Sequence, residues 1–468
     1  MVKILKKLKK YSKTYIPMHM PGHKRNTKVL KNALPYEIDI TEIHGFDNLH
    51  NPTGIIKESL LRAEKLYKSD RTFYSVNGST GCLLSAIRGM TSFGDKILVA
   101  RNCHKSVFNA IELNGLKPIY VVPELDETGI CGSINPEDVK EAIEKENIKL
   151  VVITSPTYEG VISDILSISK ICHRKKIPLL VDEAHGAHLF LEGNSALDLG
   201  ADVVVNSLHK TLPSLTQTAI INVKSKLVDA DKIERQLAVF NSSSPSYVLI
   251  ASIDECINYL TKNGQKAYKE YLKNLEDFSE FVKRLKYLKV LCKGKDDIEN
   301  HKTFYDFDAG KIVISTQHTH LTGKEVMDKL RKEFKIECEM AYYGYCLAMT
   351  SIFDTGKNLK KLALALSDMD KNFSDKDKNE AIDIIKPKVK YSPFDCTKKE
   401  KIKEKFSNCE GKVSGEYVWI YPPGVPLILP GEVIDRKMIE YITRLSKENF
   451  EILSTEKGMP KSISIIKW

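Results

Sequence analysis

Short apolar runs alternate with amphipathic segments between residues 95 and 224. The runs are rich in Val, Ile and Leu and predict strands over residues 96–100, 118–122, 150–153, 178–181, 202–205 and 219–223. Apolar residues recur at helical spacing over residues 136–145 and 165–175. This alternation is typical of an α/β fold with a mostly parallel sheet covered on both faces. Ligands of such sheets bind beyond the carboxyl ends of the strands.

The pattern becomes helical after residue 225. A long amphipathic stretch over residues 246–288 predicts a helix that connects a large domain to a smaller one. Residues 289–365 look like an α+β segment, residues 368–380 like a polar linker, and residues 398–401 like a solvated helix face. We therefore expect an N-terminal arm, a large domain, a small α+β domain and a C-terminal domain, with limits 1–50, 51–288, 289–367 and 381–468.

Composition narrows the class of protein. Of the 468 residues, 42% are apolar and 28% are charged, and no apolar run approaches the ~20 residues of a membrane span. The basic residues 1–10 predict a solvated amphipathic helix rather than a signal peptide. Ten cysteines without a C-x-x-C pair favour reduced thiols in a cytoplasm and no metal site. The net charge of +10 comes from interspersed lysines and acids, so we expect no nucleic-acid partner.

Two ionisable residues follow neighbouring strands. Asp182 follows the run at 178–181, and Lys210 follows the run at 202–205 with Ser207 and His209 just before it. A lone lysine or acid at such a place is usually a surface residue. Here the pair suits pyridoxal 5′-phosphate (PLP), because a lysine amine forms a Schiff base with its aldehyde and an acid keeps its ring nitrogen protonated. A pyridinium also supplies the partner that a buried carboxylate requires.

The rest of the chain offers a phosphate cradle. Ser79, Thr80 and Gly81 precede a helical pattern, where backbone amides and hydroxyls bind anions. His104, four residues past a predicted strand, is placed to stack on a cofactor ring. Asp182-Glu-Ala-His185 also matches a helicase box, but the G-x-x-x-x-G-K-[ST] loop that a helicase needs does not occur.

With these residues in place, the chain resembles the ornithine/lysine/arginine decarboxylase family of fold-type-I PLP enzymes, in the short form of Gram-positive bacteria. The resemblance runs from about residue 17 to residue 432. Its other motifs are Met20-Pro-Gly-His-Lys24, Asp39-Ile-Thr-Glu-Ile43, Asp47-Asn-Leu-His50, Gln217-Thr218, Ser243-Ser-Pro-Ser-Tyr247, Tyr421-Pro-Pro-Gly-Val-Pro426 and Pro430-Gly-Glu432. Pro213 departs from the family's lysine signature, which usually has a small residue there.

The resemblance implies an α/β fold of the fold-type-I PLP-dependent transferase class with small α+β C-terminal domains, and it implies residue roles. Lys210 would carry the coenzyme, Asp182 would bind its ring nitrogen, His104 would stack on the ring, and His185 would bond the ring oxygen. The phosphate would be held by Ser79, Thr80, Gly81, Ser207 and His209, with Ser242 or Ser243 from a neighbouring subunit. The substrate would be met by His23, Glu42, Asp47 and Glu432. His209 or Lys210 would deliver a proton to Cα. The site implies at least a homodimer.

The implied reaction is decarboxylation of a basic amino acid, arginine first, with lysine and ornithine as alternatives. A fold-type-I aminotransferase or acyl-CoA condensing enzyme is a second hypothesis, and a non-enzymatic PLP-binding relic is a third. Aminotransferases of this fold usually fix the α-carboxylate with an arginine of the small domain. Residues 332–435 contain no arginine, which favours the decarboxylase.

Overall fold

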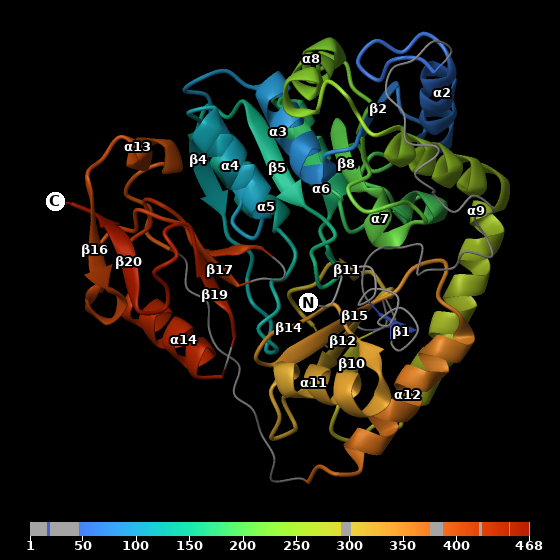
Figure 1. Ribbon diagram of the computed structural model, residues 1–468. Helices are drawn as coiled ribbons and strands as arrows, with labels where there is room; N and C mark the ends of the chain where they lie inside the picture. Colours follow the sequence, from blue (N-terminus) through green and yellow to red (C-terminus); the bar gives the residue numbers. More distant parts are fainter. Residues whose placement is uncertain are drawn as a thin grey trace, which may run out of the picture.

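A computed structural model describes residues 16–18, 46–291, 301–374, 387–420, 424–448 and 450–467, and every structural statement below concerns these residues. Figure 1 shows three regions: a large sheet in blue to green, a second sheet in yellow to orange, and a red C-terminal region beside the large sheet. Within the described chain, no helix combines the length and the apolar character needed to cross a bilayer.

The large region is built on a seven-stranded sheet, and it confirms the predicted mostly parallel architecture. In spatial order its strands are β2 (Arg71–Ser75), β9 (Ala219–Val223), β8 (Val203–Ser207), β7 (Leu179–Asp182), β5 (Leu150–Thr154), β3 (Lys96–Ala100) and β4 (Lys117–Val121). Only β9 runs antiparallel to its neighbours. All residues of β5, β7 and β8 are buried, which explains why these strands are continuous apolar runs.

Helices pack around this sheet (Figure 1). They are α2 (Ile55–Tyr67), α3 (Gly78–Met90), α4 (Lys105–Leu113), α5 (Pro136–Lys145), α6 (Ile165–Arg174) and α8 (Ala230–Phe240), with a short 3-10 helix at Leu189–Glu192. Asn135 and Asp164 cap α5 and α6 by accepting the N–H groups of Glu137 and Ser167, which fixes the starts of the two helices. The buried sides of α3, α4, α5, α6 and α8 join the strands in one apolar core, whereas those of α2 belong to a second core with α9 (Tyr247–Val282).

The long helix α9 (Tyr247–Val282) leads from the large region to the second sheet and packs against α12 (Gly356–Asp370). The linker predicted from residue 368 starts too early, because α12 continues to Asp370. The carboxylate of Asp370 accepts the N–H groups of Lys286, Tyr287 and Leu288, so this acid is part of the fold. The linker was predicted there because residues 368–380 are highly charged, which is typical of a solvated segment.

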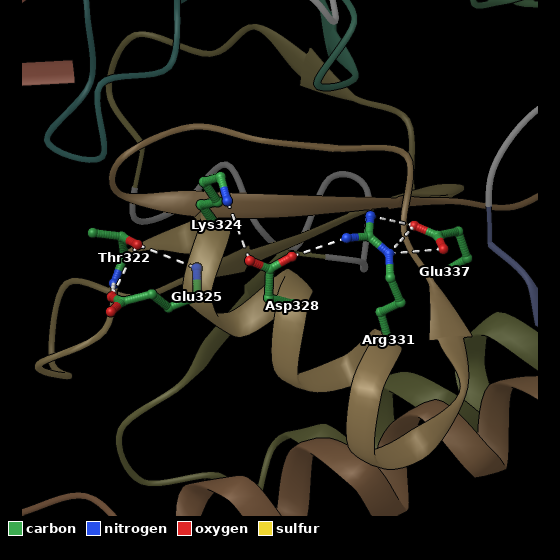
Figure 2. A network of polar contacts seen from close by, with 6 residues as sticks. All are labelled: Thr322, Lys324, Glu325, Asp328, Arg331 and Glu337. Carbon is green, nitrogen blue, oxygen red and sulfur yellow. Dashed lines mark hydrogen bonds and ion pairs between the residues drawn. The ribbon is translucent and has the colours of Figure 1, made fainter. Parts of the chain in front are cut away.

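The second sheet has the strand order β10 (Lys289–Leu291), β12 (Lys311–Ser315), β15 (Tyr345–Met349) and β14 (Met340–Ala341). Its helix α11 (Gly323–Phe334) starts with a capping box, in which Thr322 and Glu325 each bond the backbone N–H of the other (Figure 2). Arg331 near the end of α11 bonds both oxygens of Glu337 in β13 (Ile336–Glu337), which pairs with β1 (Ile16–Pro17). A small ladder between β6 (Val161–Ile162) and β11 (Asp306–Phe307) joins the region of the large sheet to the region of the second sheet.

The C-terminal region contains two small antiparallel sheets. One pairs β16 (Lys401–Lys405) with β20 (Ser462–Ile466), and the other has the order β18 (Pro426–Ile428), β17 (Val418–Ile420) and β19 (Ile452–Ser454). Its helices are α13 (Pro393–Thr397), α14 (Arg436–Lys447) and a short 3-10 helix at Phe406–Asn408. Residues 398–401 are mostly exposed, as predicted, but the prediction that they are helical is wrong. The helix ends at Thr397, and Lys401 starts an exposed strand that pairs with the mostly buried strand β20.

Candidate active site

Four of the predicted cofactor residues lie at one edge of the large sheet. Asp182 is the last residue of β7, and Lys210 lies on the short helix α7 (Leu208–Thr211) directly after β8. His104 caps α4 after β3, and Ser79 lies in the first turn of α3 after β2. Because β2, β3, β7 and β8 all point the same way, their carboxyl ends bring these side chains together.

A cavity of about 170 Å³ opens at this edge. Five predicted cofactor residues line it: Ser79, His104, Asp182, His185 and Lys210. The other lining residues are Arg101, Asn102, Val122, Pro123, Leu125, Thr128, Gly129, Cys131, Thr154, Thr157, Tyr158, Glu159, Ala184, Tyr342, Tyr343, Gly344, Tyr345, Pro387, Val425, Pro426, Leu427, Met438 and Tyr441. All three regions of the chain therefore contribute to one cavity.

Lys210 is held in an environment that favours the neutral amine. Its Nζ lies 2.6 Å from Nε2 of His185 and 5.7 Å from the ring centroid of Tyr158. Burial lowers the pKa of Lys210, although the negative charges of Asp182 and Glu339 act in the opposite direction. An amine with a lowered pKa is a better nucleophile toward a carbonyl carbon.

Asp182 is a buried carboxylate with little compensation inside the protein. It is 3% exposed, and Oδ1 accepts one hydrogen bond, from the N–H of Ala184 at 3.2 Å. Burial raises the pKa of Asp182, and the positive charge of Lys210 works against this rise. A bound cation is the partner that would stabilise the ionised form.

The neighbouring Glu183 has a structural role. Its carboxylate accepts hydrogen bonds from the N–H of Ala196 at 2.6 Å and from Nδ2 of Asn206 at 2.7 Å. Burial raises the pKa of Glu183 to about 8. The two adjacent acids of the sequence motif therefore serve different purposes, since Asp182 faces the cavity and Glu183 holds the turn that follows β7.

The surroundings of both cavity histidines favour the neutral imidazole. Burial, followed by the positive charge of Lys210, lowers the pKa of His104 to about 3 and that of His185 well below its ordinary value. The N–H of Ser106 donates to Nδ1 of His104 at 3.2 Å, which fixes the ring at the start of α4. The ring of His185 lies 4.3 Å from that of Tyr158. A neutral, oriented imidazole offers a flat face for stacking.

Other predicted phosphate ligands do not line the cavity. Ser207 is fully buried, with Oγ 3.3 Å from Nδ1 of His209, and this nitrogen also lies 3.1 Å from the carbonyl oxygen of Thr218. Thr80 is exposed on α3, and Gly81 is buried there. The phosphate roles of these four residues stay predictions.

Ser242 and Ser243 are exposed and lie outside this cavity. The carbonyl oxygen of Ser242 is 2.8 Å from Nε2 of His50, and the Ser242 hydroxyl accepts the N–H of Ser244. Their predicted role concerned the site of a neighbouring subunit, so it stays a prediction.

Of the four predicted substrate contacts, two need correction within this chain and two stay predictions. His23 and Glu42 lie outside the described residues. Asp47 does not line the cavity. Its carboxylate lies at the start of α2, where it accepts the N–H groups of Asn48, Thr53, Gly54, Ile56 and Lys57. These bonds hold its pKa below the ordinary value, against the effect of burial. Asp47 therefore organises a helix start and is not available to a substrate in this chain.

Glu432 is also placed elsewhere. Its carboxylate forms a bidentate ion pair with Arg101, at 2.7 Å to Nε and 2.9 Å to Nη2, and accepts the N–H of Leu429. Arg101 also donates to the carbonyl oxygens of Pro426 and Leu427. Arg101 lines the cavity and Glu432 does not. Because its two oxygens are already bonded, the direct substrate contact expected of Glu432 is not available in this chain.

Sequence reasoning missed the loop between β5 and β6. Thr154, Tyr158 and Glu159 line the cavity, and Thr154 is paired in register with Asp182. The position of this loop directly after the predicted strand at 150–153 was the available signal, because it follows the same rule that identified Asp182.

The cavity residues fit a coenzyme with an aldehyde, a ring nitrogen and a phosphate. Lys210 supplies the amine, Asp182 the carboxylate, and Ser79 lies in the first turn of α3, the part of a helix where backbone N–H groups can bind an anion. In addition, Thr154 Oγ1, His185 Nδ1 and Asn102 Oδ1 are buried around the cavity without a hydrogen-bond partner among the described residues. Such atoms are expected where a polar ligand completes a site.

Comparison with known proteins agrees with this arrangement. The family model described as "Orn/Lys/Arg decarboxylase, major domain" matches residues 3–320, and that of the C-terminal domain of the same family matches residues 378–452. A protein named arginine decarboxylase from Bacillus anthracis is 33% identical over 469 residues, covering 97% of this chain and 94% of that protein. One from Bacillus subtilis is 32% identical over 478 residues, covering 98% and 96%.

The fold comparison extends to more distant proteins. The crystal structure of a lysine decarboxylase from Francisella novicida superposes with a TM-score of 0.75 at 20% identity, covering 99% of this chain and 80% of that one. At this identity the likeness concerns the fold, and it agrees with the predicted sheet and the smaller C-terminal sheets.

Proposed function

We propose that this chain, which belongs to the Orn/Lys/Arg decarboxylase family, removes the α-carboxylate of a basic L-amino acid with the help of PLP. We also propose that arginine is its preferred substrate. The products would be agmatine and CO2. The observation that carries the proposal is that Lys210 and Asp182 line one cavity at the carboxyl ends of neighbouring strands. Full-length similarity to two proteins named arginine decarboxylase supports the choice of arginine over lysine or ornithine.

Each cavity residue has a part in this chemistry. When bound, PLP supplies an electron-accepting ring that stabilises the negative charge left on Cα as CO2 departs. The amine of Lys210 holds the coenzyme, and the carboxylate of Asp182 keeps the ring nitrogen protonated. The neutral ring of His104 is positioned to lie against the coenzyme. Ser79 and the amides at the start of α3 are positioned for the phosphate.

The hydrogen bonds that already engage the guanidinium of Arg101 favour decarboxylation over amino transfer as the reaction. Arg101 is the only arginine among the described cavity residues, and Glu432 and two carbonyl oxygens occupy its guanidinium. An arginine that is already paired cannot clamp the α-carboxylate of a substrate. The carboxylate is therefore left unclamped by arginine, as its departure as CO2 requires.

The same residues provide the proton that replaces CO2. When CO2 leaves, the electron pair of the broken bond stays on Cα, and one proton must be added there. The Nζ of Lys210 lies 2.6 Å from Nε2 of His185, so a proton that one of these two bases takes up from solvent can be passed on inside the cavity. We assign the delivery of the proton to Lys210, with His185 as its neighbour in the relay. His209, which does not line the cavity, remains the alternative predicted from the sequence.

We propose that the protein works as at least a homodimer, with Ser242 or Ser243 reaching the site of the partner subunit. Both serines are exposed in this chain, which supports a role at a subunit contact. Light scattering of the purified protein tests this, and a monomer with full activity would contradict it. The cytoplasmic location predicted from the sequence stays a prediction.

The direct test of the reaction uses the purified protein with PLP and L-arginine, L-lysine and L-ornithine in parallel. We expect CO2 and the corresponding amine, with the highest kcat/KM for arginine, and no turnover by the variant Lys210→Ala. A keto acid formed without CO2 would replace the proposal by an aminotransferase.

A further inference from the structure

We propose that Glu159 receives the distal cation of the substrate side chain and thereby sets the preference for a basic amino acid. This inference rests on the proposed function and adds the residue that selects the substrate. It also replaces Asp47 and Glu432, whose carboxylates are engaged elsewhere in this chain.

Glu159 lies at the cavity and is held by both large regions of the protein. It is 9% exposed and belongs to the loop between β5 and β6. The hydroxyl of Tyr345 in β15 donates to its Oε1 at 2.9 Å. The next residue, Gly160, has φ +111°, and a Cβ there would lie 2.7 Å from Cβ of Lys311. The turn therefore requires glycine, which fixes the position of Glu159.

Few acids are available for the task. Of the described residues that line the cavity, Asp182 and Glu159 are the two carboxylates. Asp182 lies beside Lys210 and His185 at the strand ends, where the ring nitrogen needs it. Among the described residues, no lysine or arginine forms an ion pair with Glu159. A substrate with an ammonium or guanidinium group would supply the missing cation.

The surroundings of Glu159 favour a cationic ligand. Burial raises the pKa of Glu159, the charge of Asp126 raises it further, and the hydroxyls of Tyr345 and Thr157 lower it. A carboxylate in this environment gains most from a cation that fully pairs with it. The rings of Tyr342 and Tyr345 line the same part of the wall, and aromatic rings contact a flat guanidinium favourably.

The first test compares arginine with citrulline, which has nearly the same shape but no charge at its distal end. In the wild type we expect a large preference for arginine. Glu159→Gln should raise KM for arginine by about 10- to 100-fold and change kcat less, because it removes one charged contact far from the reacting carbon. The turnover of citrulline should change little. Glu159→Asp should retain part of the preference.

A matched control removes the same charge outside the cavity. Glu192→Gln alters an exposed acid of the 3-10 helix at Leu189–Glu192 and should leave the ratio of arginine to citrulline unchanged. If Glu159→Gln still releases CO2 and its preference for arginine over citrulline, measured as the ratio of the two kcat/KM values, equals that of the wild type, the role proposed for Glu159 is wrong. A wild-type enzyme inactive on every basic amino acid would instead overturn the proposed function, so the two failures are distinguishable.

A second test does not depend on turnover. Butylguanidine carries the distal cation but no α-amine, so it cannot react with the coenzyme, and butylurea is its uncharged counterpart. Calorimetry on the holoenzyme should show binding of butylguanidine to the wild type and to Glu192→Gln. Binding to Glu159→Gln should be at least about 10-fold weaker. Equal binding of butylguanidine to the wild type and to Glu159→Gln would contradict the inference.

Discussion

At the scale of single residues, burial governs the charges around Lys210. The amine, the carboxylate of Asp182 and the rings of His104 and His185 all shift toward their neutral forms, because the cavity wall desolvates them. The site is thus prepared for a ligand that brings its own charges. This explains why the buried ionisable groups that have few hydrogen bonds or charge partners within the protein are those that a coenzyme would contact.

His104 gives a pH prediction with a definite sign. Its imidazole has a pKa of 6.5 when unfolded and about 3 in the fold, so between these values the unfolded chain binds more protons. Stability of the coenzyme-free protein should therefore fall as the pH drops from 6.5 toward 3. His104→Phe should remove up to about 1.4 kcal/mol per pH unit of this slope. Urea midpoints at several pH values measure it.

A matched variant separates this effect from a general loss of histidine. His318 is exposed, and His318→Phe should leave the pH slope of the urea midpoint close to that of the wild type. If His104→Phe and the wild type have the same slope, the lowered pKa is not a property of the folded protein.

At the scale of elements, sequence periodicity succeeded where local signals agreed. Helix α5 matches its predicted range and α6 ends one residue before its predicted end, and in both the apolar spacing and the capping residues Asn135 and Asp164 indicate the same start. Strand β16 was missed because Lys401–Lys405 is exposed and highly charged, and only its pairing with β20 makes it a strand.

The capping box of α11 allows a test at the same scale (Figure 2). Thr322→Ala removes the hydroxyl that accepts the N–H of Glu325 and should cost about 1 kcal/mol of stability. Lys324→Ala, which removes only the partly exposed pair with Asp328, should cost about 0.5 kcal/mol or less. Chemical denaturation measures both. Equal losses in the two variants would show that the cap does not determine the start of α11.

At the scale of the whole molecule, the ion pair of Arg101 and Glu432 joins the C-terminal region to the end of β3. These residues are 331 positions apart, and their side chains are 9% and 3% exposed. No local pattern in the sequence indicates such a pair, which is why Glu432 was assigned to the substrate. The lysine and the acid of the site were found from the sequence because each follows a strand in the chain. The position of Glu159 at the cavity, in contrast, could not be predicted from the sequence, because it depends on the contact with Tyr345 of the distant strand β15.

Breaking this pair should be costly. Glu432→Gln leaves the buried guanidinium of Arg101 without its charge partner, and we expect a loss of about 3–5 kcal/mol, measured as a lower denaturation midpoint. Glu440→Gln, which breaks the exposed pair with Arg436, should change stability by about 0.5 kcal/mol or less. Replacing both partners, as Arg101→Met with Glu432→Leu, should recover much of the loss. If the double variant is as unstable as Glu432→Gln, the cost lies in packing rather than in the unpaired charge.

The attachment of PLP to Lys210 is the claim on which the chemistry depends, and peptide mapping tests it most directly. The protein is incubated with PLP, reduced with borohydride, digested and analysed by mass spectrometry. The reduced coenzyme should be found on the peptide that contains Lys210, and it should be absent from the Lys210→Ala variant. A stoichiometric adduct on a different lysine, with Lys210 unmodified, would contradict the account.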